Sequence, residues 1–371
     1  MTEFRAASGT GPDWITACDA CITKIRKAPL SANLGFVYAS DPFAHALDMI
    51  AERLREATGI KLWVGTGGRG VCTTGHSAFE QGMIVVLAAA LQPGSFQVFD
   101  GVLTRDGNRQ HVTINGHPAN FGIVHGDPRH IKTPLMIEQL GLESDAFLIG
   151  GLTSAISNGA MQIAGHPTEG GLSGVFMSAD VPLVTGLSQG CTPIGPAREI
   201  TATDGPWIEA FDHEPALQVL KRDIGPLLAK NLDRTAGFIL AARSQPNSEQ
   251  NDYLVREIVE IDPFRQSIMV GDDLRRGDRL GFVKRDPEAA QADLRRLAGD
   301  LRRRAEGRPI LGALYHSCLE RGRHMFGTDS MELRMIEEEL GKIPLAGFFT
   351  NGEIYRNQLY GYSAILTLFL G

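Results

Sequence analysis

The sequence predicts an α+β protein of two lobes, built from repeated β-α-β-β units that form mixed sheets packed face to face with helices outside. Two observations carry this prediction. One order of elements occurs three times along the 371 residues: a buried strand, a helix, a strand that runs into glycine, and a further apolar strand. A parallel β-α-β crossover followed by an antiparallel strand gives a mixed sheet with helices on one face, so a second sheet has to bury the other face.

A helix is expected first, over residues 13–28. Apolar residues recur there at helical spacing from Trp14 to Ile25. Asp13 can cap the start of this helix and Pro29 ends it. We therefore expect an N-terminal helical segment over residues 1–29.

The three units follow in chain order. The first is expected as strands 34–39, 60–64 and 83–91, with a helix that opens at Asp41. The second is expected as strand 121–125, helix 135–140, strand 146–149 and strand 172–178. The third is expected as strand 310–316, helix 329–340, strand 343–349 and strand 363–370. A turn cluster over residues 204–215 precedes a new helix and divides the chain into an N-terminal domain, 30–213, and a C-terminal domain, 214–371.

The middle strand of each unit ends in a loop that contains glycine. These loops are residues 65–70, 150–153 and 347–353. Loops at equivalent strand ends can converge, and glycine allows backbone to approach a ligand closely. We expect a ligand cleft where they meet, between the lobes.

Composition and charge exclude several classes of protein. Asp and Glu number 43 against 36 Lys and Arg, a formal net charge of −7, which argues against a general binder of nucleic acid or anionic membranes. The basic run in residues 289–304 is expected to be a solvated helix face. No apolar run approaches the ~20 residues that span a bilayer. Five cysteines are too few for a disulfide framework, and we expect a cytoplasmic protein with free thiols.

Two short motifs match known sites only in spacing. Gly65, Gly67 and Gly70 fit the dinucleotide fingerprint, but the β-branched, glycine-broken sequence that follows cannot open the required helix. A backbone nest for a smaller anion, helped by Arg69, stays open. Ser188 has the spacing of a nucleophile elbow, yet prolines follow it where that elbow needs a helix, so a glycine-rich turn is the better interpretation.

Several cysteines and histidines allow two interpretations each. Cys18 and Cys21 are expected to pack in a core. Cys191 and Cys318 lie at strand ends beside glycine and polar residues, so each is either a reactive thiol of lowered pKa or a small buried hydrophobe. Four histidines in turn-rich sequence can each ligate a metal or haem, or serve as surface or capping residues: His117, His125, His130 and His166.

An ordered set of motifs resembles the FIST family, which has an N-terminal and a C-terminal FIST domain in tandem. The motifs are Val64-Gly65-Thr66, Gly150-Gly151, Ser188-Gln189-Gly190-Cys191-x-Pro193-Ile194-Gly195, Cys318-x-x-Arg321-Gly322, and residues 344–354 with the sequence PLAGFFTNGEI. The resemblance runs from about residue 30 to the end of the chain. It departs from the family at residues 67–71, where an acidic residue is missing and Arg69 is added.

The resemblance implies a cytoplasmic sensory module that binds amino acids or similar metabolites. Some family members bind haem and report nitric oxide to kinases. The chain has no kinase domain of its own, so any output is expected through a separate protein such as a histidine kinase. An arginine in the first loop favours a carboxylate or a phosphate over an amine.

The expected ligand site joins the glycine loops to the family motifs. Arg69 and Arg321 are expected to pair with an anionic group, and Asn351 and Glu353 to accept hydrogen bonds from donors. The full expected set is Thr66, Gly67, Arg69, Gly151, Gln189, Cys191, His316, Cys318, Arg321, Asn351 and Glu353. Two alternatives stay open: a haem-based nitric-oxide sensor with a histidine axial ligand, and an enzyme with Cys191 or Cys318 as nucleophile and His316 as base.

Overall fold

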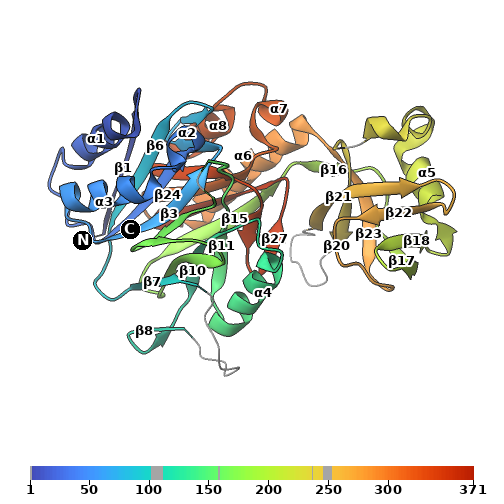
Figure 1. Cartoon of the computed structure of the whole chain (residues 1–371), viewed down its shortest axis with the longest axis horizontal. Coiled ribbons are helices and arrows are strands. Elements are labelled where there is room, and N and C mark those ends of the chain that lie inside the picture. The colour runs from blue at the N-terminus through green and yellow to red at the C-terminus, as the bar shows by residue number, and fades with distance from the viewer. Residues whose placement is uncertain (1, 102–111, 158, 236, 245–252) are drawn as a thin grey trace. The chain divides into compact units, whose positions relative to one another are not determined.

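The chain consists of two compact units in a computed structural model (Figure 1). The structure describes residues 2–101, 112–157, 159–235, 237–244 and 253–371. The main unit contains Met1–Gln189 and Gln291–Gly371, and the inserted unit contains Gly190–Ala290. Within the described residues, no helix is both long and apolar enough to cross a membrane.

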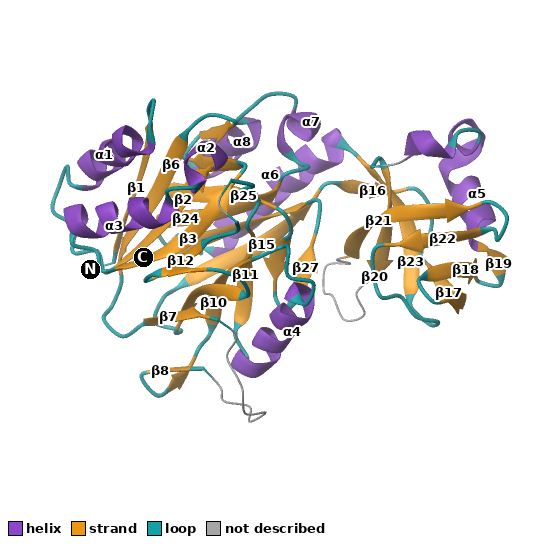
Figure 2. Ribbon diagram, viewed as in Figure 1, coloured by secondary structure: helices purple, strands orange, loops and turns teal. Residues whose placement is uncertain are grey.

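The main unit contains three six-stranded sheets (Figure 2). The first has the order β1 (Glu3–Thr10), β6 (Met83–Ala90), β2 (Leu34–Ser40), β3 (Leu62–Gly68), β12 (Gln162–Ala164), β13 (Pro167–Thr168). The second has the order β7 (Phe96–Asp100), β14 (Leu172–Met177), β10 (Phe121–Gly126), β11 (Phe147–Leu152), β26 (Glu353–Tyr355), β27 (Gln358–Tyr360). The third has the order β15 (Leu183–Gln189), β28 (Ser363–Leu370), β24 (Ile310–Cys318), β25 (Leu345–Thr350), β4 (Gly70–Thr73), β5 (His76–Phe79).

Strand pairing confirms the three repeated β-α-β-β units. In each unit the first and middle strands are parallel, as in β2–β3, β10–β11 and β24–β25. The last strand of each unit is antiparallel to the first, as in β2–β6, β10–β14 and β24–β28. The expected mixed α+β architecture is therefore present, with the same local topology three times.

The units are interlocked in a cycle by hairpins. The β4–β5 hairpin follows the middle strand of the first unit but pairs with β25 of the third sheet. The β26–β27 hairpin follows the middle strand of the third unit but pairs with β11 of the second sheet. The β12–β13 hairpin follows the middle strand of the second unit but pairs with β3 of the first sheet. Each sheet thus contains a two-stranded hairpin that comes from another unit.

One glycine recurs at the same register position of each middle strand. Gly65, Gly150 and Gly347 lie opposite the equivalent residue of the neighbouring parallel strand. A Cβ on any of them would lie 1.7–1.9 Å from that residue's carbonyl oxygen, far inside contact distance. Only glycine fits there, which explains why each middle strand has glycine near its end.

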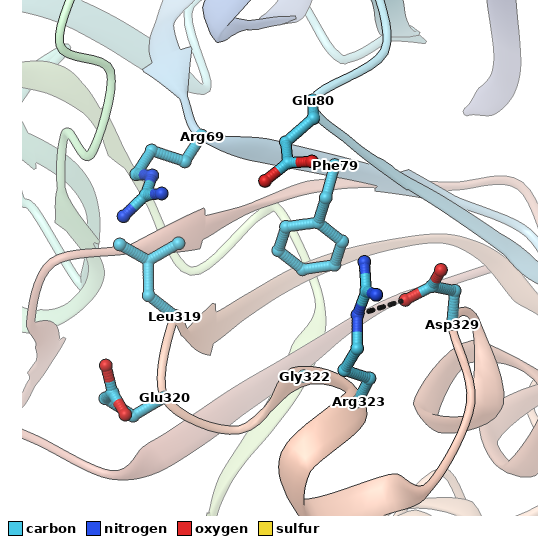
Figure 3. A pocket seen from close by; sticks show the side chains of 8 residues that line it. All are labelled: Arg69, Phe79, Glu80, Leu319, Glu320, Gly322, Arg323 and Asp329. Carbon is cyan, nitrogen blue, oxygen red and sulfur yellow. Dashed lines mark ion pairs between the residues drawn. The ribbon is translucent and has the colours of Figure 1, made fainter.

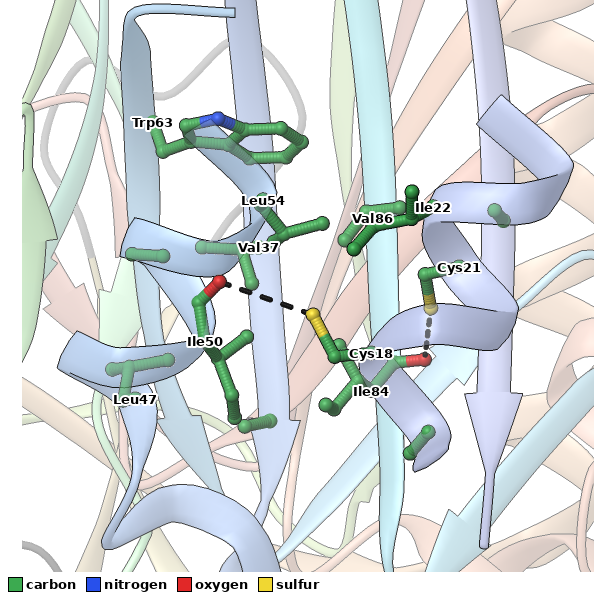
Figure 4. Close-up of a cluster of buried hydrophobic side chains, with 14 of the residues drawn as sticks. Cys18, Cys21, Ile22, Val37, Leu47, Ile50, Leu54, Trp63, Ile84 and Val86 are labelled. Carbon is green, nitrogen blue, oxygen red and sulfur yellow. Dashed lines mark hydrogen bonds between the residues drawn. The ribbon is translucent and has the colours of Figure 1, made fainter. Parts of the chain in front are cut away.

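Helices cover the outer faces of the sheets. The helices of the main unit, apart from α6, are α1 (Trp14–Ile25), α2 (Asp41–Ala44), α3 (Leu47–Thr58), α4 (Thr133–Ser144), α7 (Gly322–Phe326) and α8 (Met331–Leu340). Helix α6 (Pro287–Arg304) begins in the inserted unit and continues into the main unit. Figure 4 shows α1 and α3 packed through Cys18, Cys21 and Ile50 onto strand residues such as Val37 and Val86.

The opposite faces of two sheets are joined by aromatic rings. Phe4 of β1 stacks on Phe369 of β28 with ring centroids 4.7 Å apart. Tyr38 of β2 stacks on Phe348 of β25 at 5.0 Å. The first and third sheets therefore pack face to face, as the predicted architecture requires.

The inserted unit is a sheet that closes on itself and carries helix α5. Its order is β16 (Cys191–Pro193), β23 (Arg279–Arg285), β17 (Arg198–Asp204), β18 (Trp207–Phe211), β22 (Ser267–Val270), β21 (Tyr253–Asp262), β20 (Ile239–Ser244), and β20 pairs back with β23. The inserted unit also contains β19 (Glu214–Pro215), α5 (Ala216–Ala229) and the 3-10 turn Leu232–Thr235. The main unit also contains a small hairpin formed by β8 (Thr113–Ile114) and β9 (His117–Pro118). Leu217 and Leu220 of α5 pack on Phe211 and Phe282.

Two local features differ from the sequence-based expectation. Strand β1 precedes the N-terminal helix, in a segment where only helix was expected; few apolar residues mark it, and Phe4 and Ala7 are its buried ones. The helix that opens at Asp41 is divided into α2 and α3, because Ala46 has non-helical backbone angles of φ −109° and ψ 17°.

Candidate functional site

The three glycine-marked loops meet in the main unit. The Thr153 hydroxyl donates to the Gly67 carbonyl at 2.6 Å, which joins the loop after β11 to the end of β3. The Asn351 amide donates to the Leu152 carbonyl at 3.0 Å, and the Leu152 amide donates to the Gly352 carbonyl at 2.9 Å. Loops separated by more than 80 residues are thus held together by direct hydrogen bonds.

A pocket of about 330 Å³ lies beside this junction (Figure 3). Its lining comes from the β4–β5 hairpin on one side and from the segment after β24 on the other. The lining residues are Arg69, Phe79, Glu80, Leu319, Glu320, Gly322, Arg323 and Asp329. The volume is at the small end of the ~300–1,000 Å³ typical of ligand sites.

The hairpin places two opposite charges at the pocket. Gly70 and Phe79 form the pair of β4 and β5 that is farthest from the turn. Arg69 directly precedes Gly70 and Glu80 directly follows Phe79, so the two charged residues lie at the open end of the hairpin. Both side chains are exposed, and neither forms an ion pair or side-chain hydrogen bond with any described residue. Phe79 supplies an apolar wall and packs on Phe349 with ring centroids 4.3 Å apart.

The opposite side of the pocket carries a weak surface ion pair. Arg323 lies 3.4 Å from Asp329, and both side chains are more than half exposed (59% and 53%). Solvent screens such pairs strongly, so a ligand can compete for either partner. The pocket therefore offers cationic and anionic groups around an apolar wall.

Arg321 lies in a buried ion pair and does not line the pocket. Its Nε donates to Glu332 at 2.9 Å, and both side chains are almost fully buried. Glu332 also accepts from the hydroxyls of Tyr315 (2.9 Å) and Ser317 (3.1 Å). Burial alone lowers the pKa of Arg321, but the Glu332 carboxylate raises it above the usual range. The structure therefore commits this guanidinium to an internal partner.

Asn351 and Glu353 also lie outside the pocket lining. Asn351 is exposed, whereas Glu353 is fully buried. Glu353 accepts hydrogen bonds from Thr350 and from both the amide and the hydroxyl of Ser363, at 3.1 and 2.7 Å. Burial raises the pKa of Glu353 to about 7, although these hydrogen bonds oppose the rise.

Three aromatic side chains form a central cluster from equivalent positions of the three first strands. Tyr38, His125 and His316 each directly follow the residue that faces the recurrent glycine. The Tyr38 hydroxyl lies 3.3 Å from His125 Nε2 and 3.4 Å from His316 Nε2. Burial lowers the pKa of both histidines to about 3, so both are neutral near pH 7. Fully buried, this cluster belongs to the core and not to the pocket.

The remaining expected site residues are also placed away from the pocket. Thr66 is buried and donates to the Met161 carbonyl at 2.9 Å. Gly151 packs beside Thr350, and the Gln189 amide donates to Asp293 at 2.7 Å. Gly67 is part of the loop junction, and Cys191 belongs to the inserted unit. Of the expected set, Arg69 alone is among the residues that line the pocket.

Burial bears on the two interpretations of Cys318. The residue is 7% exposed, and burial raises the pKa of its thiol well above the usual value. Both observations favour a small buried hydrophobe over a reactive thiol of lowered pKa. The low pKa of His316 likewise makes it a poor general base at neutral pH.

The other candidate metal and haem ligands do not converge. His117 and His130 are exposed, and exposed His166 lies 2.8 Å from Asp100. None of the histidines whose side chains the structure describes lines the pocket. Across the described ranges, no group of three or more His, Cys, Asp or Glu side chains is arranged to hold a metal ion.

Sequence reasoning missed most of the pocket wall. Glu80 and Phe79 have a detectable signal, because Thr74-Gly75 between β-branched and apolar residues is typical of a hairpin turn. A hairpin over residues 70–79 implies that Arg69 and Glu80 are neighbours. The wall formed by Leu319 and Arg323 has no such local signal, because it faces the hairpin only through long-range packing.

Comparisons with known proteins match the chain to two domain models in tandem. The FIST N domain model matches residues 33–214, and the FIST C domain model matches residues 216–356. An uncharacterized protein of Mycobacterium bovis is 31% identical over 313 residues, which cover 78% of both chains. An uncharacterized protein of Mycobacterium tuberculosis is 28% identical over 327 residues, which cover 83% of both chains. The pocket combines residues from both matched domains.

Proposed function

Because the chain belongs to the FIST family, whose domains are associated with sensory binding of small ligands, we propose that it senses a small zwitterionic metabolite of the amino-acid type. The ligand site is the pocket between the β4–β5 hairpin and the segment after β24. The observation that carries the proposal is the pair Arg69 and Glu80, two opposite charges beside one apolar wall with no partner among the described residues.

Each pocket group has a matching part in an α-amino acid. The Arg69 guanidinium can bind a carboxylate with two parallel hydrogen bonds. The Glu80 carboxylate can accept hydrogen bonds from an ammonium group. Phe79 and Leu319 can contact an apolar side chain. The other charges, on Glu320, Arg323 and Asp329, lie farther around the rim and allow further polar groups on the ligand.

This sensor passes its output to a separate protein, and the family implies a histidine kinase as the candidate. We place the protein in the cytoplasm. The haem-based alternative has less support, because no histidine is found among the described residues that line the pocket. A Soret band in the purified protein would contradict this preference. The cysteine-enzyme alternative has less support, because burial raises the pKa of the Cys318 thiol and Cys191 is buried and absent from the pocket lining.

Titration calorimetry with L-phenylalanine and the other proteinogenic amino acids tests the proposal. Arg69→Met and Glu80→Gln should each weaken binding about tenfold or more, since hydrogen bonds to charged groups contribute about 1.5–3 kcal/mol. Arg295→Met and Glu306→Gln are matched controls: both residues are exposed, lie outside the pocket lining, and Glu306 shares the left-handed backbone of Glu80. Absence of binding by any amino acid, or unchanged affinity in both pocket variants, would overturn the proposal.

A further inference from the structure

Ser154 is a residue at which all three repeated units contact one another. Its hydroxyl oxygen accepts the Arg69 amide at 2.9 Å, in the loop after β3. The same hydroxyl donates to the Phe349 carbonyl of β25. Ser154 itself follows β11 and is 7% exposed. One hydroxyl thus links the ends of the three middle strands.

Arg69 is the single residue between the end of β3 and the start of β4. Gly68 is paired with Ser40 and Gly70 with Phe79, whereas the Arg69 amide donates to the Ser154 hydroxyl. The Arg69 side chain is exposed and makes no ion pair or side-chain hydrogen bond with a described residue. The point at which this side chain leaves the backbone is held by the Ser154 hydroxyl together with the paired residues on either side.

We propose that Ser154 is a positioning residue that fixes Arg69 for recognition of the ligand's carboxylate. Ser154 is absent from the pocket lining and acts through Arg69. This inference rests on the proposed function for its effect on binding. Its structural half, that the Ser154 hydroxyl holds the Arg69 amide, is tested without a ligand.

The ligand-free experiment measures hydrogen exchange of the Arg69 amide by NMR in the full chain. Ser154→Ala should speed exchange about five- to tenfold, because the amide loses its acceptor. Ser154→Thr keeps the hydroxyl and should retain the slow exchange. Ser144→Ala is the matched control: Ser144 is also buried and donates to a carbonyl, that of Leu140 at 2.6 Å, at the end of α4. Equal exchange in wild type and Ser154→Ala would overturn the inference, as would Thr behaving like Ala.

The binding experiment compares L-phenylalanine with phenethylamine, which lacks the carboxylate. Ser154→Ala should weaken binding of L-phenylalanine about tenfold and leave phenethylamine unchanged, because the Arg69 contact alone is affected. A merely structural defect would weaken both compounds by the same factor, and that result would overturn the positioning role. If wild type binds neither compound, nor any other amino acid, the proposed function fails, whereas the exchange experiment still decides whether Ser154 holds Arg69.

Discussion

Loss of the buried guanidinium of Arg321 gives the sharpest test of the structure. In Arg321→Met, Glu332 keeps the hydroxyl donors of Tyr315 and Ser317 but loses its charge partner at 2.9 Å. Removing one member of a buried ion pair costs about 3–5 kcal/mol, because an uncompensated charge stays buried. At about 2–4 °C per kcal/mol for a domain of 150–250 residues, the melting temperature should fall by roughly 6–20 °C.

The double variant Arg321→Met with Glu332→Leu separates the charge from the packing. Both charges are then absent, and replacement of a whole buried pair by apolar residues is often neutral or stabilising. The double variant should therefore recover most of the lost stability. Urea unfolding in a Trp207→Phe background serves as the assay, since the remaining tryptophans, Trp14 and Trp63, belong to the main unit. A loss below about 1 kcal/mol in the single variant, or no recovery in the double, would refute the buried pair.

Three further predictions follow from burial. Gly347→Ala should abolish folding of the main unit, since its Cβ would lie 1.8 Å from the Tyr315 carbonyl oxygen. Gly299→Ala in α6 is the control and should be tolerated. Soluble yield and circular dichroism report both outcomes, and a folded Gly347→Ala variant would contradict the register of β24 and β25. The two histidines of the central cluster have a pKa near 3 when folded and 6.5 in the unfolded chain, so stability should fall as the pH drops from 6.5 toward 3. Each contributes about 1.4 kcal/mol per pH unit, and His125→Asn should reduce the slope of urea-derived stability against pH; an unchanged slope would count against burial. Burial raises the pKa of the Cys18 and Cys21 thiols to about 12, so both should resist iodoacetamide at pH 8 until urea unfolds the protein. Rapid labelling of the native protein would contradict the burial of α1 against the first sheet.

The repeated units could be predicted because their signals are local. Apolar runs such as residues 83–91 are long enough to mark strands, and glycine marks the end of each middle strand. The exchange of hairpins could not be predicted, because β4 pairs with a strand about 275 residues later, Cys72 opposite Gly347, and nothing in either segment names its partner.

The site was predictable in part for the same reason. Arg69 is conspicuous as a charge within a glycine-rich loop that follows a strand. Arg321 also follows a strand end, but the carboxylate that occupies it, Glu332, lies on the next long helix, and sequence alone does not show that the two meet. Burial thus separates a residue available to a ligand from one committed to the core, and burial is a property of the tertiary structure.

The cyclic exchange of hairpins has a consequence for synthesis on the ribosome. The β4–β5 hairpin is made early, but its acceptor strand β25 ends at Thr350, close to the end of the chain. The nascent first unit therefore exposes an unpaired hairpin until β25, about 275 residues later, has emerged. Unpaired strand edges favour aggregation and long-range pairing is slow, so fragments that stop before residue 345 should not persist as folded species.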